Sequence, residues 1–404
     1  MAVKKEEVRE LTLDEFKKRV AKMSKDYYSL SKTQFVRSGS IVFDTLLGGG
    51  IPKGAFILLS SDSGIGKSTA ALNISRTYCM QGLRVAYFDY EGGVNEQQVR
   101  SMGLEPYLYD ENTNPDGLFY CYQTQTYRDA EVLLDNLMSK FDLVVIDSAT
   151  EMLTEKVKGA SAEDALPGID ARVMGTFLKR YKAEARRRGT SWIIINQLRN
   201  KISFTGPTTA GEAGGNALKF AADVRLMMKK SLKGDLVREE ETALGVQKVP
   251  FGALCTIWAE KNRFARPKIP LGIAVIFGKG ISNEYAYYDF MVAHKAVKQA
   301  GSWFTVKFDG ISEQLHGAAA VINWIGSHKE EVKAYIASQG GYKLVATSSE
   351  SLDLNEGVSE LGDGPIFEGD FEQDNSEDEV MDDVGAGSET GGFEADGFEG
   401  LGDE

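Results

Sequence analysis

Short apolar runs alternate with longer amphipathic stretches along the first two thirds of this chain. Four runs have the length of a buried β-strand: Ala55–Leu59, Arg84–Asp89, Asp142–Asp147 and Ser191–Asn196. Three stretches have the apolar spacing of an α-helix: Ser68–Met80, Tyr127–Lys140 and Ile169–Arg188. Strands that alternate with helices favour a mostly parallel sheet covered on both faces. The pattern therefore predicts an α/β fold.

Further segments flank this alternating pattern. Leu11–Met23 repeats apolar residues at helical spacing with lysines on its other face, which predicts a short N-terminal helix. Tyr285–Ser338 has the pattern of a small α/β domain with a turn at Trp303. Three runs predict β-rich additions to the core: Asp223–Met228, Cys255–Glu260 and Gly272–Phe277. We expect four parts: an N-terminal helical segment (1–35), a core (36–280), a small C-terminal domain (281–345) and a tail (346–404).

Cysteine usage and the spread of apolar residues bear on the compartment. The 404 residues include 3 cysteines, each standing alone, so neither a disulfide framework nor a Cys-x-x-Cys metal site is predicted. The 3 histidines are too scattered for a metal set. The N-terminus is charged and no run approaches about 18 apolar residues, which argues against a signal peptide and a membrane span. We expect a cytoplasmic protein with no membrane partner.

The formal net charge of −13 combines two opposite regions. Residues 350–404 hold 20 acidic and no basic residues, which leaves 46 basic against 39 acidic residues in 1–349. The body is thus about +7 and the tail −20. The tail is rich in Gly, Ser, Asp and Glu, a composition typical of disorder. Either it only keeps the chain soluble, or it mimics a polyanion that competes for a basic groove, or its phenylalanines bind a protein partner.

A glycine-rich loop follows the first apolar run and opens the first helical stretch. Residues 61–68, Ser-Asp-Ser-Gly-Ile-Gly-Lys-Ser, have the spacing of a phosphate-binding loop, with Ser61 at the usual first glycine. In such a loop backbone N–H groups cradle phosphate oxygens, Lys67 contacts the β- and γ-phosphates, and Ser68 coordinates Mg²⁺. The expected nucleotide contacts are Ser61, Asp62, Ser63, Gly64, Ile65, Gly66, Lys67, Ser68 and Thr69. Taken alone, the motif has a chance loop as its alternative.

Carboxylates at strand ends strengthen the nucleotide interpretation. The apolar run before Asp147 is typical of a motif that places a carboxylate beside Mg²⁺. Glu91 follows the intervening strand, where it could orient or deprotonate an attacking water. Asp89 is an alternative base, or else a structural residue at the strand end. The sequence therefore predicts a site for ATP and Mg²⁺, with Ser68 and Asp147 as metal ligands.

Residues beyond these motifs match a known family. The two longest matching blocks are Asn196-Gln197-Leu-Arg-Asn-Lys-Ile and Gly214-Gly215-Asn216-Ala-Leu-Lys-Phe. Shorter ones are Gly39-Ser40, Lys261-Asn262-Arg263 and Ala300-Gly301-Ser302-Trp303. Together they closely resemble the RecA recombinases over roughly residues 36–337. The resemblance implies a RecA-type P-loop ATPase core with a mostly parallel central sheet, a short N-terminal helix, a small α/β C-terminal domain and a disordered acidic tail.

The resemblance also implies roles by position. Glu91 matches the catalytic base, and Gln197 matches a sensor of the γ-phosphate. Lys261 and Arg263 match cations that reach the neighbouring protomer's γ-phosphate, so the site would be completed in trans. The expected catalytic residues are Glu91, Lys67, Gln197, Lys261 and Arg263. The family's adenine-contacting aspartate and stacking tyrosine correspond here to Asn95 and Gln98.

Two loops would contact DNA by the same resemblance. The second, Leu198–Ala213, is rich in Gly, Thr and Pro, and it would place cations on phosphates and apolar side chains between bases. The first, Val157–Gly168, leads into a helix with basic residues at helical spacing. The expected DNA-binding residues are Arg172, Lys179, Arg199, Lys201, Ile202, Phe204, Gly214, Gly215 and Asn216. An ordinary flexible surface loop is the alternative.

These features predict an ATP-dependent homologous recombination protein that forms helical filaments on single-stranded DNA and exchanges strands with duplex DNA. The N-terminal segment would dock on the next protomer, and the C-terminal domain would gather duplex DNA. A bacterial and a phage-encoded member fit equally well, both in the bacterial cytoplasm. One alternative is a ring-forming ATPase or helicase of the same core fold on single-stranded DNA. Another is a DNA-binding or signalling relative without turnover.

Overall fold

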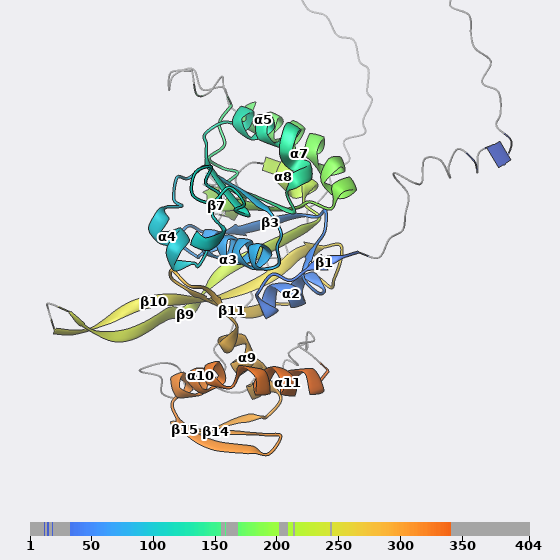
Figure 1. Cartoon of the computed structure of the whole chain (residues 1–404). Helices are drawn as coiled ribbons and strands as arrows, with labels where there is room; N and C mark the ends of the chain where they lie inside the picture. Colours follow the sequence, from blue (N-terminus) through green and yellow to red (C-terminus); the bar gives the residue numbers. More distant parts are fainter. Residues whose placement is uncertain are drawn as a thin grey trace, which may run out of the picture. The chain divides into compact units, whose positions relative to one another are not determined.

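The computed structural model describes residues 33–154, 169–201, 209–212, 215–242 and 245–340, together with Thr12, Asp14, Glu15, Lys18 and Lys158 (Figure 1). Of the predicted N-terminal helix, Asp14, Glu15 and Lys18 are helical. The Thr12 N–H donates to Glu15 Oε2 over 3.0 Å, and the Glu15 N–H donates to Thr12 Oγ1 over 3.3 Å. This reciprocal pair is a capping box, typical of a helix start. The rest of that helix and the acidic tail lie outside the described residues.

A parallel sheet forms the centre of the core. Six neighbouring strands of the described residues run parallel in the order β9-β3-β7-β6-β4-β5. They are β3 (Phe56–Ser61), β4 (Val85–Asp89), β5 (Phe119–Gln123), β6 (Leu143–Asp147), β7 (Ser191–Lys201) and β9 (Val224–Thr242). The predicted mostly parallel sheet is confirmed, and β5 is a strand that the apolar pattern did not predict.

Antiparallel strands extend this sheet at one edge. β10 (Gly245–Asn262) pairs with β9, β11 (Leu271–Ile276) with β10, and β12 (Gly280–Ser282) with β11. The predicted β-rich runs fall in β9, β10 and β11, except that Asp223 and Phe277 lie one residue outside, and β9 and β10 are 19 and 18 residues long. Their distal residues pair only with each other in the described register, so they form a hairpin that runs past the other strands (Figure 1).

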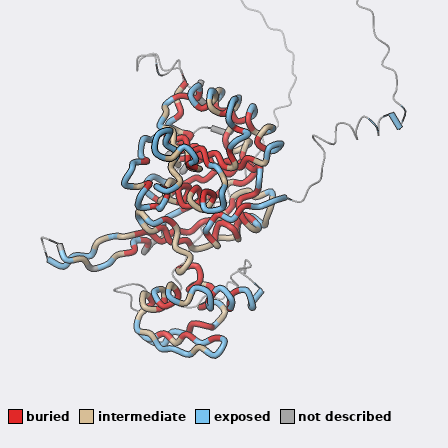
Figure 2. The backbone as a smooth tube through the Cα atoms, in the orientation of Figure 1, coloured by how far each residue is buried: buried red, intermediate tan, exposed pale blue. Residues whose placement is uncertain are grey.

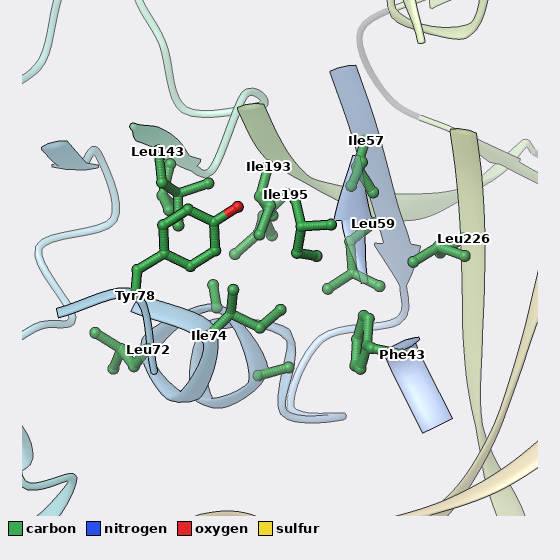
Figure 3. Close-up of a cluster of buried hydrophobic side chains, with 14 of the residues drawn as sticks. Phe43, Ile57, Leu59, Leu72, Ile74, Tyr78, Leu143, Ile193, Ile195 and Leu226 are labelled. Atoms are coloured by element: carbon green, nitrogen blue, oxygen red, sulfur yellow. The ribbon is translucent and has the colours of Figure 1, made fainter. Parts of the chain in front are cut away.

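Helices cover both faces of the parallel sheet. They are α2 (Ile41–Leu47), α3 (Lys67–Met80), α4 (Glu96–Ser101), α5 (Tyr127–Leu137), α7 (Ile169–Arg188) and α8 (Gly215–Ala221). Ile57 and Leu59 of β3 pack on the α3 face with Tyr78, as Figure 3 shows. Phe56 and Leu58 pack on the opposite face, with the cluster that α5 and α7 supply. The strands are therefore buried on both sides, as the red tube of the sheet in Figure 2 shows.

Short elements complete the core. β1 (Phe35–Val36) pairs with β2 (Ile51–Pro52) in a small two-stranded sheet. Two short 3-10 helices are η1 (Glu105–Tyr107) and η2 (Met138–Lys140).

Within the described residues no helix has both the length and the apolar composition that a bilayer crossing needs.

The expected DNA-binding loop at 198–213 is a hairpin in its described part. β7 continues to Lys201, and β8 (Thr209–Glu212) pairs antiparallel with it, Leu198 lying opposite Glu212. The prediction of a loop was wrong for residues 198–201 and 209–212, because the polar residues after Ile195 end the apolar run while the backbone continues to pair. Residues 202–208 and 213–214 lie outside the described residues.

A smaller group of elements follows β12. It comprises α9 (Asn283–Ala293), β13 (Val297–Ala300), β14 (Trp303–Phe308), β15 (Ile311–His316), α10 (Ala318–Ser327) and α11 (Lys329–Ser338). The three strands form an antiparallel sheet, and Ala300 and Trp303 are the last pair before the predicted turn. Phe304, Val321 and Ile325 belong to a separate apolar cluster. The predicted small α/β arrangement is present, and its described helices are α9, α10 and α11. The four-part division of the chain stays a prediction.

Candidate nucleotide-binding site

The glycine-rich loop joins β3 to α3, in the order that a phosphate loop requires. Gly64 and Gly66 have φ angles of 75° and 98°, a left-handed backbone that glycine adopts without strain. A Cβ at Gly66 would lie 2.7 Å from Val275 Cγ1, so glycine is needed there. Ser61 is not among the described residues with positive φ, and serine is therefore accommodated. No side chain in the described part caps α3, whose first N–H groups are left to a phosphate.

Lys67, the first residue of α3, is a buried cation with uncharged acceptors. It is 6% exposed, and its Nζ donates to Ser61 O over 3.1 Å, to Ser61 Oγ over 3.0 Å and to Asp62 O over 2.7 Å. Burial lowers the pKa of Lys67, while the charges of Glu91 and Asp147 oppose that shift. An ammonium held by neutral oxygens fits a phosphate as its counter-charge.

Asp147 ends β6 beside the loop, near two hydroxyl groups. The Tyr87 hydroxyl donates to Asp147 Oδ2 over 2.5 Å. Burial raises the pKa of Asp147 to about 6, although the Tyr87 hydrogen bond and the nearby Ser68 hydroxyl lower it. Oδ1 is buried with no hydrogen-bond partner in the described residues. An unpartnered carboxylate oxygen beside a serine hydroxyl fits the predicted Mg²⁺ ligands.

The protein ligands alone do not enclose a metal. In the described ranges no group of three or more His, Cys, Asp or Glu side chains is arranged to hold an ion. Mg²⁺ keeps waters and commonly shares its ligands with substrate phosphates. Ser68 and Asp147 therefore fit a Mg²⁺ that arrives with a nucleotide.

Glu91 and Gln197 meet although they are 106 residues apart in the chain. Gln197 Nε2 donates to Glu91 Oε1 over 2.6 Å, from β7 to the turn after β4. The Tyr90 and Glu91 N–H groups donate to Asp147 O over 2.6 and 3.3 Å, which ties this turn to β6. Glu91 is exposed, so its carboxylate is accessible to an attacking water. Both predicted residues therefore lie at the carboxyl end of the sheet with the phosphate loop.

Two polar residues after β4 have local structural partners. Asp89 is 1% exposed, and its carboxylate accepts the N–H groups of Gly93 over 3.3 Å and Val94 over 2.9 Å. These bonds favour the structural alternative for Asp89 over a catalytic one. Asn95 is the N-cap of α4, and its Oδ1 accepts the Gln98 N–H over 2.9 Å. A contact between Asn95 and adenine stays a prediction.

The two predicted trans cations lie at the other end of β3. The Asp223 N–H donates to Phe56 O over 2.8 Å, at the first residue of β3. Arg263 Nη1 lies 3.0 Å from Asp223 Oδ1, and Lys261 Nζ donates to Ala222 O over 2.8 Å. The phosphate loop instead follows the last residue of this six-residue strand. At about 3.3 Å per residue, the two ends of β3 are about 17 Å apart.

The structure describes six of the nine expected DNA-binding residues. Two of them are exposed on α7: Arg172 and Lys179. Four are described in their backbone, two in β7 and two at the start of α8: Arg199, Lys201, Gly215 and Asn216. Three lie outside the described residues: Ile202, Phe204 and Gly214. Their role in DNA binding stays a prediction.

Sequence reasoning missed two side chains around these sites. Tyr87 lies in an apolar strand, so the sequence suggests a core aromatic residue and gives no sign that its hydroxyl contacts Asp147. The apolar pattern predicts Asp223 as the first residue of a strand, and its carboxylate contacts Arg263. Both residues are at most 1% exposed. A polar group within a buried run needs a partner, and that requirement is the signal that could have identified them.

Comparison with known proteins agrees with this geometry. The model of the RecA N-terminal domain family matches residues 9–282. The chain is 31% identical to the RecA protein of Fusobacterium nucleatum over 289 residues, covering 70% of this chain and 71% of that protein. It is 29% identical to the RecA protein of Malacoplasma penetrans, covering 73% and 84%. A crystal structure of the RadB recombinase aligns with a TM-score of 0.43 and 22% identity, covering 61% of this chain and 98% of that one. Because the family model spans more than half of its length, this chain belongs to the RecA family of ATP-dependent recombination proteins.

Proposed function

We propose that this chain forms helical filaments on single-stranded DNA, hydrolyses ATP between successive protomers and exchanges DNA strands. The observation that carries the proposal is the separation along β3. Lys261 and Arg263 have their partners beside the first residue of β3, whereas the phosphate loop follows its last residue. A separation of about 17 Å exceeds the reach of either side chain. This separation supports a role for these cations at a neighbour's nucleotide rather than at their own.

The residues at the carboxyl end of the sheet would then bind the nucleotide and activate the attacking water. Lys67 and the first N–H groups of α3 bind the phosphates. Ser68 and Asp147 hold Mg²⁺, which when bound neutralises charge on the phosphate oxygens. Glu91 orients and deprotonates the attacking water. The Gln197 amide holds the Glu91 carboxylate at 2.6 Å, and a γ-phosphate oxygen competes for the same N–H group.

This competition for the Gln197 amide would couple nucleotide binding to DNA binding. Leu198 follows Gln197 directly and begins the pairing of β7 with β8. Arg199 and Lys201 belong to the same hairpin. A Gln197 side chain that turns toward a phosphate therefore acts on a basic hairpin, which we propose contacts the DNA backbone.

Duplex DNA and protein partners are further parts of the proposal. In the smaller group of elements, Lys295, Lys298 and Lys307 line one hollow. Three lysines in one hollow support binding of a second, duplex DNA through its phosphates. The acidic tail is proposed to compete with DNA or to bind other proteins.

The test is ATP turnover with and without single-stranded DNA. Turnover by the full chain should rise strongly when DNA is added, and Glu91→Gln should remove the rise while nucleotide binding persists. Equal rates with and without DNA would refute the proposed function. Electron microscopy with a nonhydrolysable ATP analogue should show filaments on the same DNA, and closed rings would favour the ring-motor alternative.

A further inference from the structure

Three cations converge on one buried carboxylate beside the start of β9. Asp223 is 1% exposed. Its Oδ1 lies 3.2 Å from Lys182 Nζ, 2.6 Å from Arg186 Nη2 and 3.0 Å from Arg263 Nη1. Lys182 and Arg186 belong to α7, whereas Arg263 directly follows β10. Asp223 therefore joins two elements that are far apart in the chain.

The Asp223 carboxylate is also fixed to the sheet. The Phe56 N–H donates to Asp223 Oδ2 over 3.1 Å, and the Asp223 N–H donates to Phe56 O over 2.8 Å. Burial on its own raises the pKa of Asp223, but the Phe56 hydrogen bond and the charges of Lys182 and Arg186 outweigh it, so the pKa is lowered. Asp223 is therefore an ionised group in a defined position.

The Arg263 guanidinium is anchored by one nitrogen and otherwise accessible to solvent. Its Nη1 contacts Asp223, while the side chain is 52% exposed. A guanidinium carries five N–H donors in one plane, so a single anchoring contact leaves donors for a second anion. Anchoring also removes rotamer freedom that a long side chain would otherwise lose on binding. The geometry is that of an arginine prepared to receive a phosphate.

The same place would be strongly cationic without this carboxylate. Lys261 lies close by, with its Nζ on the Ala222 carbonyl. Burial and the charge of Arg263 lower the pKa of Lys261, and the charge of Asp223 opposes them. Like charges at short range repel, so the cations would spread apart if Asp223 were neutral.

We propose that Asp223 is a positioning residue for the cation that each protomer donates to its neighbour: it orients Arg263 and offsets the charges of Lys182 and Arg186 around it. The inference rests on the trans completion proposed above. If the Asp223 ion pairs only stabilise the fold, replacing Asp223 affects the stability of the chain that carries the replacement. If Asp223 positions a donated cation, replacing it lowers ATP turnover by the neighbouring protomer.

Mixed filaments separate these two roles. Chains with Glu91→Gln bind nucleotide and enter filaments without turning over, so all turnover comes from added wild-type chains. With these carrier chains in large excess, most wild-type sites receive their donated cations from a carrier. Carriers that also contain Asp223→Asn should lower turnover per wild-type chain about fivefold or more, because small misplacements of a catalytic group have large effects on rate.

Three comparisons interpret that result. Carriers with Glu91→Gln and Arg263→Gln lack the donated guanidinium, and they should lower turnover at least as much. Carriers with Glu91→Gln and Asp135→Asn lose a different α7 ion pair, the one between Asp135 and Arg180 at 2.6 Å, and they should have no effect. If Arg263→Gln lowers turnover but Asp223→Asn does not, the role of Asp223 is wrong and trans completion stands. If Arg263→Gln has no effect, completion of the neighbour's site by Arg263 is wrong.

Filament entry is measured in the same samples by co-sedimentation with DNA. If the Asp223→Asn carrier does not sediment with DNA, a carrier with Asp223→Ser is used in its place. Asp223→Ser removes the same charge with a shorter side chain. Failure of both carriers to enter filaments would assign Asp223 to folding or assembly and overturn the proposal.

Discussion

Tyr87 is the side chain that most changes the picture of the nucleotide site. Its ring is fully buried in β4, and its hydroxyl donates to Asp147 Oδ2 over 2.5 Å. The nearby Ser68 hydroxyl also lowers the pKa of this carboxylate, while Oδ1 has no hydrogen-bond partner in the described residues. Tyr87 thus holds one oxygen of Asp147, and the other oxygen has no partner there. The neutral Tyr87 phenol therefore stabilises the ionised Asp147 carboxylate, whereas burial alone would favour its protonated form.

Replacement of Tyr87 by Phe tests this role at the scale of one atom. The ring stays, so no cavity forms, but the Asp147 carboxylate loses a buried donor. We expect a loss of about 1–3 kcal/mol in the free energy of unfolding at pH 8, because a charged group left without its hydrogen bond keeps its desolvation penalty. Urea unfolding of the nucleotide-free chain measures this loss.

The pH dependence of that loss has a defined sign. The Tyr87 hydrogen bond lowers the pKa of Asp147, which is about 6 in the wild-type chain, so its removal raises the pKa further. The stability that the hydrogen bond supplies is present above that pKa and is lost as the pH falls through it. The difference between the two chains should therefore shrink as the pH falls toward about 6 and be small below it. In an Asp147→Asn background it should be small at every pH, and an equal loss there would show that the hydroxyl acts elsewhere.

At the scale of elements, the β9–β10 hairpin divides into a packed base and an unsupported arm. Leu236 and Leu254 at the base belong to a buried cluster with Tyr285. Residues 239–242 and 245–248 pair only across the hairpin in the described register, and we call the segment 239–248 the arm. A two-stranded ribbon without further packing contributes little to stability in water.

Removal of the arm should therefore leave the stability of the core unchanged. Replacement of residues 239–248 by Asn-Gly closes the hairpin on the Arg238–Val249 pair with a favoured two-residue turn. We expect the melting temperature to change by less than about 2 °C, because surface changes are usually within about 0.5 kcal/mol. Leu236→Ala at the base is the contrasting variant, and its cavity should cost about 2–5 kcal/mol. A large loss on arm removal would mean that the arm packs on the core. Differential scanning calorimetry of both variants measures these effects.

The same division explains which elements the sequence predicted. β3, β4 and β6 are buried on both faces, and continuous apolar runs such as Phe56–Leu59 reveal them. The distal part of β9 is not packed on the core, so its run of glutamates carries no strand signal. β5 was not predicted because its tyrosines are only partly buried and Gln123 is exposed, which weakens the apolar run. Burial on both faces thus decides how far a strand can be predicted from its own residues.

The candidate site shows the same limit. The phosphate loop and Asp147 could be predicted because each lies in a local motif of fixed spacing. The Glu91–Gln197 contact joins residues 106 positions apart, and only the family resemblance brought them together. Asp223 has neither a local motif nor a family role, since its function depends on cations from α7 and from the end of β10. Long-range charge networks of this kind leave no periodic signal in the sequence.

At the scale of the whole molecule, the charge distribution makes a prediction about the acidic tail. The body carries about +7 and residues 350–404 carry −20, so the tail can compete with DNA for the same cations. A chain that ends at Ser349 should bind single-stranded DNA about tenfold more tightly at about 0.05 M salt, with a steeper dependence of log affinity on log salt. The difference should disappear at high salt, where charges more than a few Å apart are screened.

The control must separate charge from length. A full-length chain in which Asp and Glu of residues 350–404 are replaced by Asn and Gln keeps the excluded volume of the tail and removes its charge. If the tail acts as a polyanion, this neutral variant should bind like the truncated chain. If it instead binds like the wild-type chain, the tail hinders DNA through its bulk. Fluorescence anisotropy of a labelled oligonucleotide, measured over a salt series for the three chains, distinguishes these cases. Equal affinity and equal salt slope in all three would exclude competition by the tail, and its aromatic residues would then remain the basis for a protein partner.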